Sequence, residues 1–266
     1  RPWAFPGAEQ FQTELAAYSY SEGNFELPDE WLSRHKADII IAFFGFNESF
    51  QGKEGLDNYK AELEAFINHT LNQRYNGIAP PQLAIVSPIA FEDLSGRYDL
   101  PDGKKENANL LMYAQAMQEI AHNHNLVFAD TYHASLKWFT GAKEPLTIDG
   151  SQLNEEGYKK LAVLLADELF GKKAPKVEAN RELVLQAVKE KNWAWHNDFK
   201  IPNGVHIYGR RYNPFGPDNY PAEIEKLRQM TAIRDTAIWL AVKGEKMDLS
   251  ETDKHTRTLP EIKTNF

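Results

Sequence analysis

The feature that most constrains the fold is the uninterrupted apolar run Ile39–Phe44, which is rich in β-branched and aromatic residues. Such a run predicts a strand that is buried on both faces of a sheet. The run stops at Gly45, and a polar group containing Asn47, Glu48 and Ser49 follows at once. In an open α/β sheet this is the carboxyl end of a strand, where ligands bind. Two interpretations of Asn47 stay open here: its side-chain amide donates to a developing negative charge, or it only closes a turn.

The same pattern of strand followed by helix recurs along the first two thirds of the chain. Leu83–Val86 and Leu126–Asp130 are two further apolar runs, and each follows an amphipathic helical stripe, at 56–71 or 110–121. Asn154 is a suitable N-cap for another helix, with Glu155 and Glu156 in its first turn. The alternation predicts an α/β fold with a parallel sheet covered by helices on both faces. In the last of these helices we expect an inward-facing stripe: Tyr158, Leu161, Leu164, Leu165 and Leu169.

Composition excludes several classes of function. The chain has 266 residues and a net charge of −8, which argues against broad binding to nucleic acid or to an anionic membrane. No apolar stretch approaches the roughly 20 residues that a membrane-spanning helix needs. With no cysteine, disulfides, thiolate metal ligands and a cysteine nucleophile are excluded. We expect no cofactor and no metal site.

A change of composition divides the chain. Gly171–Pro175 marks a boundary between an α/β domain at 1–171 and a C-terminal appendage at 172–266, which we expect to pack on the domain. Two helices are predicted in the appendage, at 180–191 and 221–242, and the polar tail from Gly244 is predicted to be extended. Aromatic residues crowd the stretch 193–220, and two interpretations stay open: they stack on sugar rings, or they pack the appendage onto the domain.

Two motifs at predicted strand ends resemble a known family. The blocks Gly45-Phe46-Asn47-Glu48 and Asp149-Gly150-Ser151-Gln152, the second followed by Leu-Asn, occur in the order and context typical of SGNH (GDSL-type) hydrolases. The resemblance covers roughly residues 1–170. It implies a three-layer α/β/α, flavodoxin-like fold and an ester hydrolase with a Ser-His-Asp triad. It also implies that Gly7 and Asn47 donate to the oxyanion and that Asp149 is the acid of the triad.

Further segments are similar to those of a bacterial subgroup of this family. They are Phe43–Phe50, Ser87–Ala90 and Phe215–Pro221. In that subgroup, SGNH-like modules occur in large exported proteins, some of which carry c-type haem domains. The resemblance therefore implies a periplasmic or extracellular location. No haem attachment motif is present, because the chain has no cysteine.

The chain departs from the family pattern at two places. Gln152 stands where the family has the triad histidine, and a glutamine side chain cannot accept a proton from a hydroxyl near neutral pH. In addition, no nucleophile block precedes Gly7. If Arg1–Phe5 is the second strand of the family's sheet, the first strand, which belongs beside Ile39–Phe44, is missing from the chain. A gap there would leave backbone groups unpaired, so we expect a segment upstream of Arg1 or another chain to fill it.

Other polar residues near strand ends are weaker candidates. His133 follows the Leu126–Asp130 strand and is either a binding residue or a surface histidine. Ser49 and Ser87 have no base beside them in sequence, so each is either a binding residue or a turn hydroxyl. Glu48 and Asp149 either form a carboxylate pair across the site, or each has a separate structural role.

Two hypotheses for function follow. The first is an ester hydrolase, related to carbohydrate esterases and deacetylases, in which Gln152 replaces the usual histidine. The second is a catalytically inactive SGNH-fold module that binds a glycan or a protein. Both predict a small acylated or carbohydrate ligand, or a partner domain, rather than nucleic acid.

Overall fold

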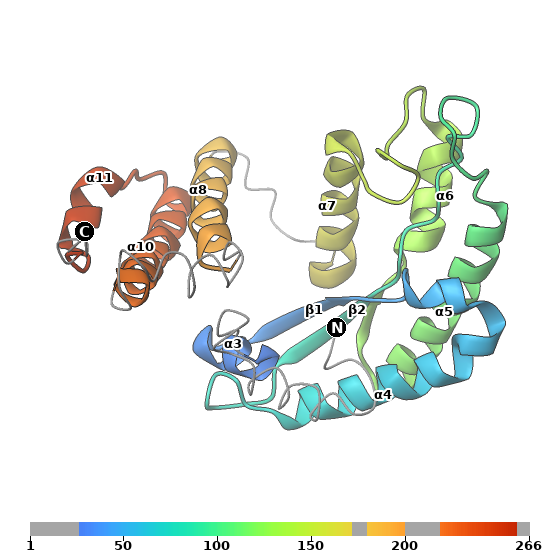
Figure 1. The fold of residues 1–266 in the computed structure, drawn as a ribbon, viewed down its shortest axis with the longest axis horizontal. Helices are drawn as coiled ribbons and strands as arrows, with labels where there is room; N and C mark the ends of the chain where they lie inside the picture. Colours follow the sequence, from blue (N-terminus) through green and yellow to red (C-terminus); the bar gives the residue numbers. More distant parts are fainter. Residues whose placement is uncertain (1–26, 172–179, 200–218, 260–266) are drawn as a thin grey trace, which may run out of the picture. The chain divides into compact units, whose positions relative to one another are not determined.

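The computed structural model describes residues 27–171, 180–199 and 219–259 of the chain (Figure 1). These residues fall into two compact units, the first containing 27–171 and the second containing the other two ranges. Three of the sequence predictions lie outside the described residues: the strand Arg1–Phe5, the oxyanion donor Gly7, and the part of the aromatic stretch from 200 to 218.

A parallel sheet forms the centre of the first unit. Its strands are β1 (Ile39–Phe43), β2 (Gln82–Val86) and β3 (Val127–Ala129), in the order β1-β2-β3. The register places Ile40 opposite Leu83 in β1 and β2. All three predicted strands are therefore present, and β3 is shorter than predicted. Within the described residues β1 pairs with β2 alone, so the additional strand expected beside β1 stays a prediction.

Helices lie on both sides of this sheet, as the sequence predicts. Figure 1 shows α4 (Leu56–Asn72) and α7 (Glu155–Phe170) on opposite sides. Together with α5 (Lys104–Asn123), α4 encloses the main core, which Ile40, Ala42 and Ile85 enter from the strands. Burial of this apolar surface is the main stabilising contribution to the unit. The fold is the predicted three-layer α/β/α arrangement of flavodoxin-like type.

Two predictions of burial in this unit are wrong. β1 is buried on one face only, because Ile39, Ile41 and Phe43 are 52%, 39% and 54% exposed. Tyr158 of α7 does not face inward, since it is 58% exposed. The two errors have a common cause: α7 packs against β3 and not along the whole sheet, which leaves the α7-side face of β1 uncovered by this helix.

Two further helices of the first unit lie at the carboxyl edge of the sheet, the 3-10 helix η2 (Glu48–Gly55) after β1 and α6 (Thr131–Gly141) after β3. α3 (Pro28–Arg34) precedes β1 and lies at the opposite, amino edge. The side chain of Asp130 caps α6 by accepting a hydrogen bond from the His133 N–H. Asn154 caps α7 in the same way through the Gly157 N–H, which confirms the predicted N-cap.

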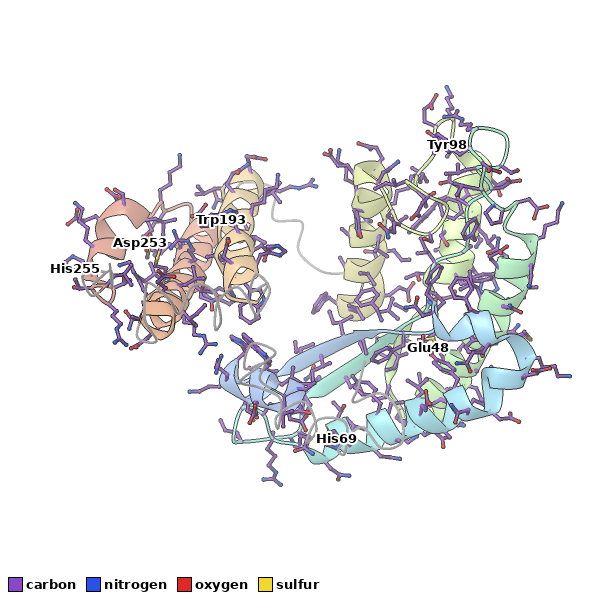
Figure 2. All side chains as sticks on the ribbon, viewed as in Figure 1. Glu48, His69, Tyr98, Trp193, Asp253 and His255 are labelled. Atoms are coloured by element: carbon purple, nitrogen blue, oxygen red, sulfur yellow. The ribbon has the colours of Figure 1, made fainter. Side chains whose placement is uncertain are left out.

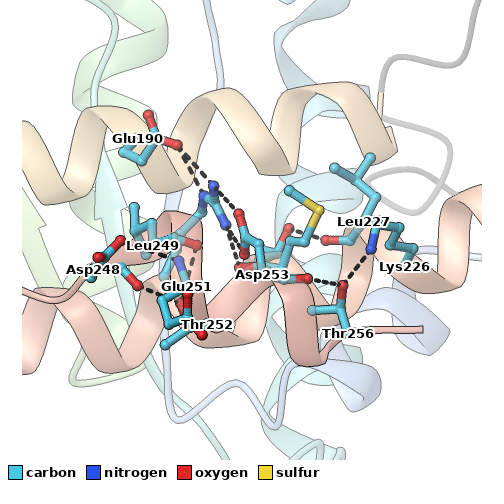
Figure 3. A network of polar contacts seen from close by, with 12 residues as sticks. Glu190, Lys226, Leu227, Asp248, Leu249, Glu251, Thr252, Asp253 and Thr256 are labelled. Atoms are coloured by element: carbon cyan, nitrogen blue, oxygen red, sulfur yellow. Dashed lines mark hydrogen bonds and ion pairs between the residues drawn. The ribbon is translucent and has the colours of Figure 1, made fainter. Parts of the chain in front are cut away.

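The second unit is built on an antiparallel pair of helices, α8 (Arg181–Phe199) and α10 (Asn219–Val242). The pairing is antiparallel because Asn180 contacts Val242 whereas Glu190 contacts Arg234. The predicted extended tail is wrong in part, since α11 (Leu249–Thr252) and η4 (Asp253–His255) follow α10. Asp253 of η4 and Glu190 of α8 both accept hydrogen bonds from Arg234, which joins three elements (Figure 3). Among the described helices, none is both long and apolar enough to span a bilayer.

Candidate functional site

The turn after β1 forms one side of the candidate site. Gly45 has φ of +95°, and a Cβ there would lie 3.0 Å from Met117 Sδ, so the turn favours glycine. The Gly45 N–H donates to Glu48 Oε2 at 3.0 Å, and Ser49 Oγ donates to the Phe46 carbonyl at 2.6 Å. Figure 2 labels Glu48, which lies where the chain passes from β1 into η2. Glu48 and Ser49 therefore hold the backbone on which Asn47 sits. Asn47 itself is exposed at the start of η2.

A buried tyrosine supports this turn from below. Burial, reinforced by the carboxylate of Glu48, raises the pKa of Tyr59 well above its ordinary value. The ring of Tyr59 lies 4.9 Å from that of Tyr113, centroid to centroid. The floor of the turn is therefore uncharged and aromatic at physiological pH.

The opposite side is a short hairpin at residues 146–154, which we call the Asp149 hairpin. The Ile148 N–H donates to the Gln152 carbonyl at 2.7 Å, and the Asn154 N–H donates to the Leu146 carbonyl at 2.9 Å. Inside this hairpin Asp149 Oδ1 accepts hydrogen bonds from the Ser151 N–H, the Ser151 hydroxyl and the Gln152 N–H, at 2.9, 3.0 and 2.7 Å. Asp149 therefore shapes the tip of the hairpin and fixes the backbone of Gln152.

These contacts predict an acid-sensitive hairpin tip. Partial burial opposes ionisation of Asp149, but the hydrogen bonds from Ser151 and Gln152 outweigh it and lower the pKa below the ordinary 3.8. Because the pKa of Asp149 is lower in the folded state, the stabilisation is complete at pH values above the unfolded-state pKa. It is lost as the pH falls through the folded-state pKa. We expect the amide NMR shifts of Ser151 and Gln152 to move together with a midpoint below pH 3.8. Asp149→Asn should abolish this titration, and a midpoint at or above 3.8 would contradict the assignment.

Ser87 at the end of β2 has a structural role at this edge. Its hydroxyl oxygen accepts hydrogen bonds from the Thr131 N–H at 3.0 Å and the Tyr132 N–H at 3.1 Å. It thereby caps the first turn of α6 from a neighbouring strand. Ser87 is only 2% exposed, and its lone pairs serve backbone donors, so it is poorly placed to act as a nucleophile.

A cavity of about 620 Å³ lies between the β1 turn and the Asp149 hairpin. It brings together four of the candidate catalytic and binding residues: Asn47, Glu48, Ser87 and Gln152. Asp149, Ser49 and His133 are not among its lining residues. The rest of the lining is mainly apolar and aromatic: Phe43, Phe44, Phe46, Pro88, Ile89, Thr131, Ser151, Leu153, Tyr158 and Leu161.

The described lining of this cavity contains no histidine. His133 Nδ1 lies 2.7 Å from Asp130 Oδ2, so its ring is held at the N-terminus of α6. Glu48, the one carboxylate in the described lining, is engaged by the Gly45 N–H. Glu48 and Asp149 each bind backbone groups of their own turns. Among the described residues there is also no group of three or more His, Asp or Glu that could hold a metal ion.

Sequence reasoning missed Glu92, which is buried beneath the Asp149 hairpin. Its carboxylate accepts hydrogen bonds from Leu146 and Thr147, which lie 54 and 55 residues further along the chain. The one signal in the sequence is weak: an acidic residue directly follows the apolar segment Ile89–Phe91. A charged side chain in such a position is buried only when it is hydrogen-bonded.

Comparison with known proteins decides the family. Residues 4–160, more than half of the chain, match the model of the GDSL-like lipase/acylhydrolase family. The chain belongs to this family. The resemblance in the Gly45–Glu48 and Asp149–Gln152 blocks is thus confirmed at the level of the family. No curated protein gives a significant match.

Solved structures that resemble this GDSL-like chain include an esterase and a lipase/acylhydrolase. A variant of Axe2, an acetyl-xylooligosaccharide esterase from a Geobacillus species, is 19% identical, with a TM-score of 0.43, over 62% of this chain and 69% of that one. The lipase/acylhydrolase from Enterococcus faecalis is 25% identical, with a TM-score of 0.39, over 54% of this chain and 66% of that one.

Proposed function

We propose that this GDSL-like chain is an ester hydrolase with an altered triad. In this proposal the side-chain amide of Asn47 stabilises the oxyanion, together with Gly7, and Asp149 keeps the acid position of the triad. Gln152 replaces the base and orients substrate or water. The nucleophilic serine belongs to the strand expected beside β1.

The observation that carries the proposal is that Asn47 and Gln152 line one cavity at the carboxyl edge of a parallel sheet. They come from segments more than a hundred residues apart, at the place where open α/β sheets bind ligands. Membership of a lipase/acylhydrolase family supports ester hydrolysis as the reaction.

Acylated carbohydrate is the substrate class that we propose. Phe43 and Tyr158 line the cavity and are 54% and 58% exposed. Exposed aromatic rings in the wall of such a cavity suit the apolar faces of sugar rings. The described lining also lacks a lysine or arginine, which favours a neutral acyl ester over a phosphoester.

The test is hydrolysis of a short-chain aryl ester and of an acetylated xylooligosaccharide by the full-length protein. We expect Asn47→Ala to lower kcat by about 100- to 1,000-fold, the usual effect of removing an oxyanion donor. Asn58→Ala is the matched control, because Asn58 is exposed on α4 and its side chain donates to Glu62 of the same helix at 2.6 Å. Activity that is unchanged in Asn47→Ala would contradict the proposal.

A specific observation favours a second candidate, a binding module without catalysis. Gln152 stands in the base position, and the described lining of the cavity offers no histidine in its place. This candidate predicts that neither the wild type nor Gln152→His hydrolyses esters above background, while ligand binding survives Asp149→Ala. The hydrolase proposal instead predicts a faster Gln152→His variant with a new inflection near the histidine pKa of about 6.5.

A further inference from the structure

The buried carboxylate of Glu92 accepts hydrogen bonds from three donor groups at the base of the Asp149 hairpin. The Leu146 N–H lies 3.1 Å from both of its oxygens, and the Thr147 N–H donates to Oε2 at 2.8 Å. The Thr147 hydroxyl donates to the same oxygen at 2.5 Å. Glu92 is only 6% exposed, so these donors replace water around a buried charge.

The backbone of Glu92 also binds the tip of the same hairpin. The Glu92 N–H donates to the Gly150 carbonyl at 2.8 Å. Gly150 has φ of +88°, and a Cβ there would lie 2.5 Å from the ring of Phe91. The loop after β2 therefore contacts the Asp149 hairpin at both the base and the tip of the hairpin.

Thr147 links the buried carboxylate to the tip. Its hydroxyl carries one proton, which is donated to Glu92, and its oxygen accepts a hydrogen bond from the Gly150 N–H at 3.1 Å. The direction of the hydroxyl thus depends on Glu92 being an acceptor. If an N–H faced Thr147 instead, the hydroxyl proton would turn toward Gly150 and oppose its N–H.

We propose that Glu92 is a positioning residue that holds the Asp149 hairpin in the conformation that directs Ser151 and Gln152 into the cavity. The inference rests on the proposed function in so far as this cavity is the active site. Glu92 acts through Thr147 and Leu146 and does not itself line the cavity.

The experiment replaces Glu92 with glutamine, which keeps the size of the side chain. A glutamine offers one oxygen and two N–H donors, so it cannot accept from all three groups that Glu92 serves. Glu144→Gln is the matched control, because Glu144 lies just before the hairpin, is 80% exposed and pairs with Arg97.

The first measurement needs no enzymatic activity. In Glu92→Gln we expect amide hydrogen exchange at Gly150 and Gln152 to be about tenfold faster, as buried hydrogen bonds are lost. We also expect the NMR-detected pKa of Asp149 to rise toward 3.8, because the donors at the tip become less ordered. Thr147→Val removes the hydroxyl at nearly constant volume and should show the same faster exchange at Gly150. If Glu92→Gln does not fold, this variant still tests the connection from Glu92 through Thr147 to Gly150.

The second measurement is kinetic and separates positioning from general destabilisation. For the active full-length protein we expect kcat to fall about 10- to 100-fold in Glu92→Gln, with KM nearly unchanged and folding intact at the assay temperature. Wild-type exchange and an unchanged pKa of Asp149 in both variants would overturn the inference. A loosened hairpin in a protein whose wild type hydrolyses no ester would support the positioning role and contradict the proposed function.

Discussion

Replacing Arg234 with methionine is expected to lower the free energy of unfolding of the second unit by about 2–4 kcal/mol. The guanidinium donates to Glu190 Oε1 from Nε and Nη2, to both oxygens of Asp253 at 3.0 Å, and to the Met230 carbonyl at 3.1 Å. Its side chain is 5% exposed, so methionine would leave two carboxylates without their buried cation. The expected loss is below the usual 3–5 kcal/mol for a broken buried pair, because Glu190 is 43% exposed and regains water.

Hydrogen exchange of α8 and α10, together with urea unfolding followed by tryptophan fluorescence, measures this loss. The control is Lys254→Met, which breaks an exposed ion pair with Glu251 in the α11–η4 segment and should change stability by at most about 0.5 kcal/mol. Adding Glu190→Gln and Asp253→Asn to Arg234→Met should recover part of the loss, since the cost comes from unpaired charge. If Arg234→Met is as stable as Lys254→Met, the ion pairs of Arg234 with Glu190 and Asp253 do not stabilise the second unit.

The sheet could be predicted from the sequence because its strands are apolar, β-branched and bounded by glycine, proline or polar residues. Strand β1 shows how far that signal goes. An apolar run without alternation predicts burial on both faces, yet Ile39 and Phe43 are exposed on one. Whether a face is covered depends on where α7 packs, and the sequence of a strand does not contain that information.

Two other features were missed for a different reason. Glu92 binds backbone N–H groups, which every residue except proline carries, so its partners leave no mark in the sequence. The α11–η4 segment has few apolar residues and was predicted to be extended. It is held by polar contacts, the cap from Asp248 and the ion pair between Asp253 and Arg234. Blocks such as Asp149–Gln152 were found because the residue type itself carries the chemistry.

Gly157→Ala is expected to destabilise the first unit by about 1–3 kcal/mol, although helix propensity predicts the opposite sign. Gly157 lies in the first turn of α7, where alanine in place of glycine would ordinarily stabilise a helix by about 1 kcal/mol. However, a Cβ at this position would lie 2.3 Å from the carbonyl oxygen of Leu146 and 2.8 Å from Leu153 Cδ2. That carbonyl accepts the Asn154 N–H, and the N–H of Leu146 is bound to Glu92, so the backbone has little freedom to move away.

Gly141→Ala in α6 is the matched control, because nothing lies within 4 Å of the added methyl group and propensity alone should act. Urea unfolding of the two variants should therefore give changes of opposite sign, and two stabilised proteins would contradict the packing of α7 on the hairpin.

Combining Gly157→Ala with Glu92→Gln then tests whether the added methyl group displaces the hairpin or α7. If the clash displaces the Asp149 hairpin, the double variant will lose less unfolding free energy than the sum of the two single-variant losses, because each substitution loosens the same contacts. If α7 moves instead, the losses will add, and the hairpin will keep its slow exchange in Gly157→Ala.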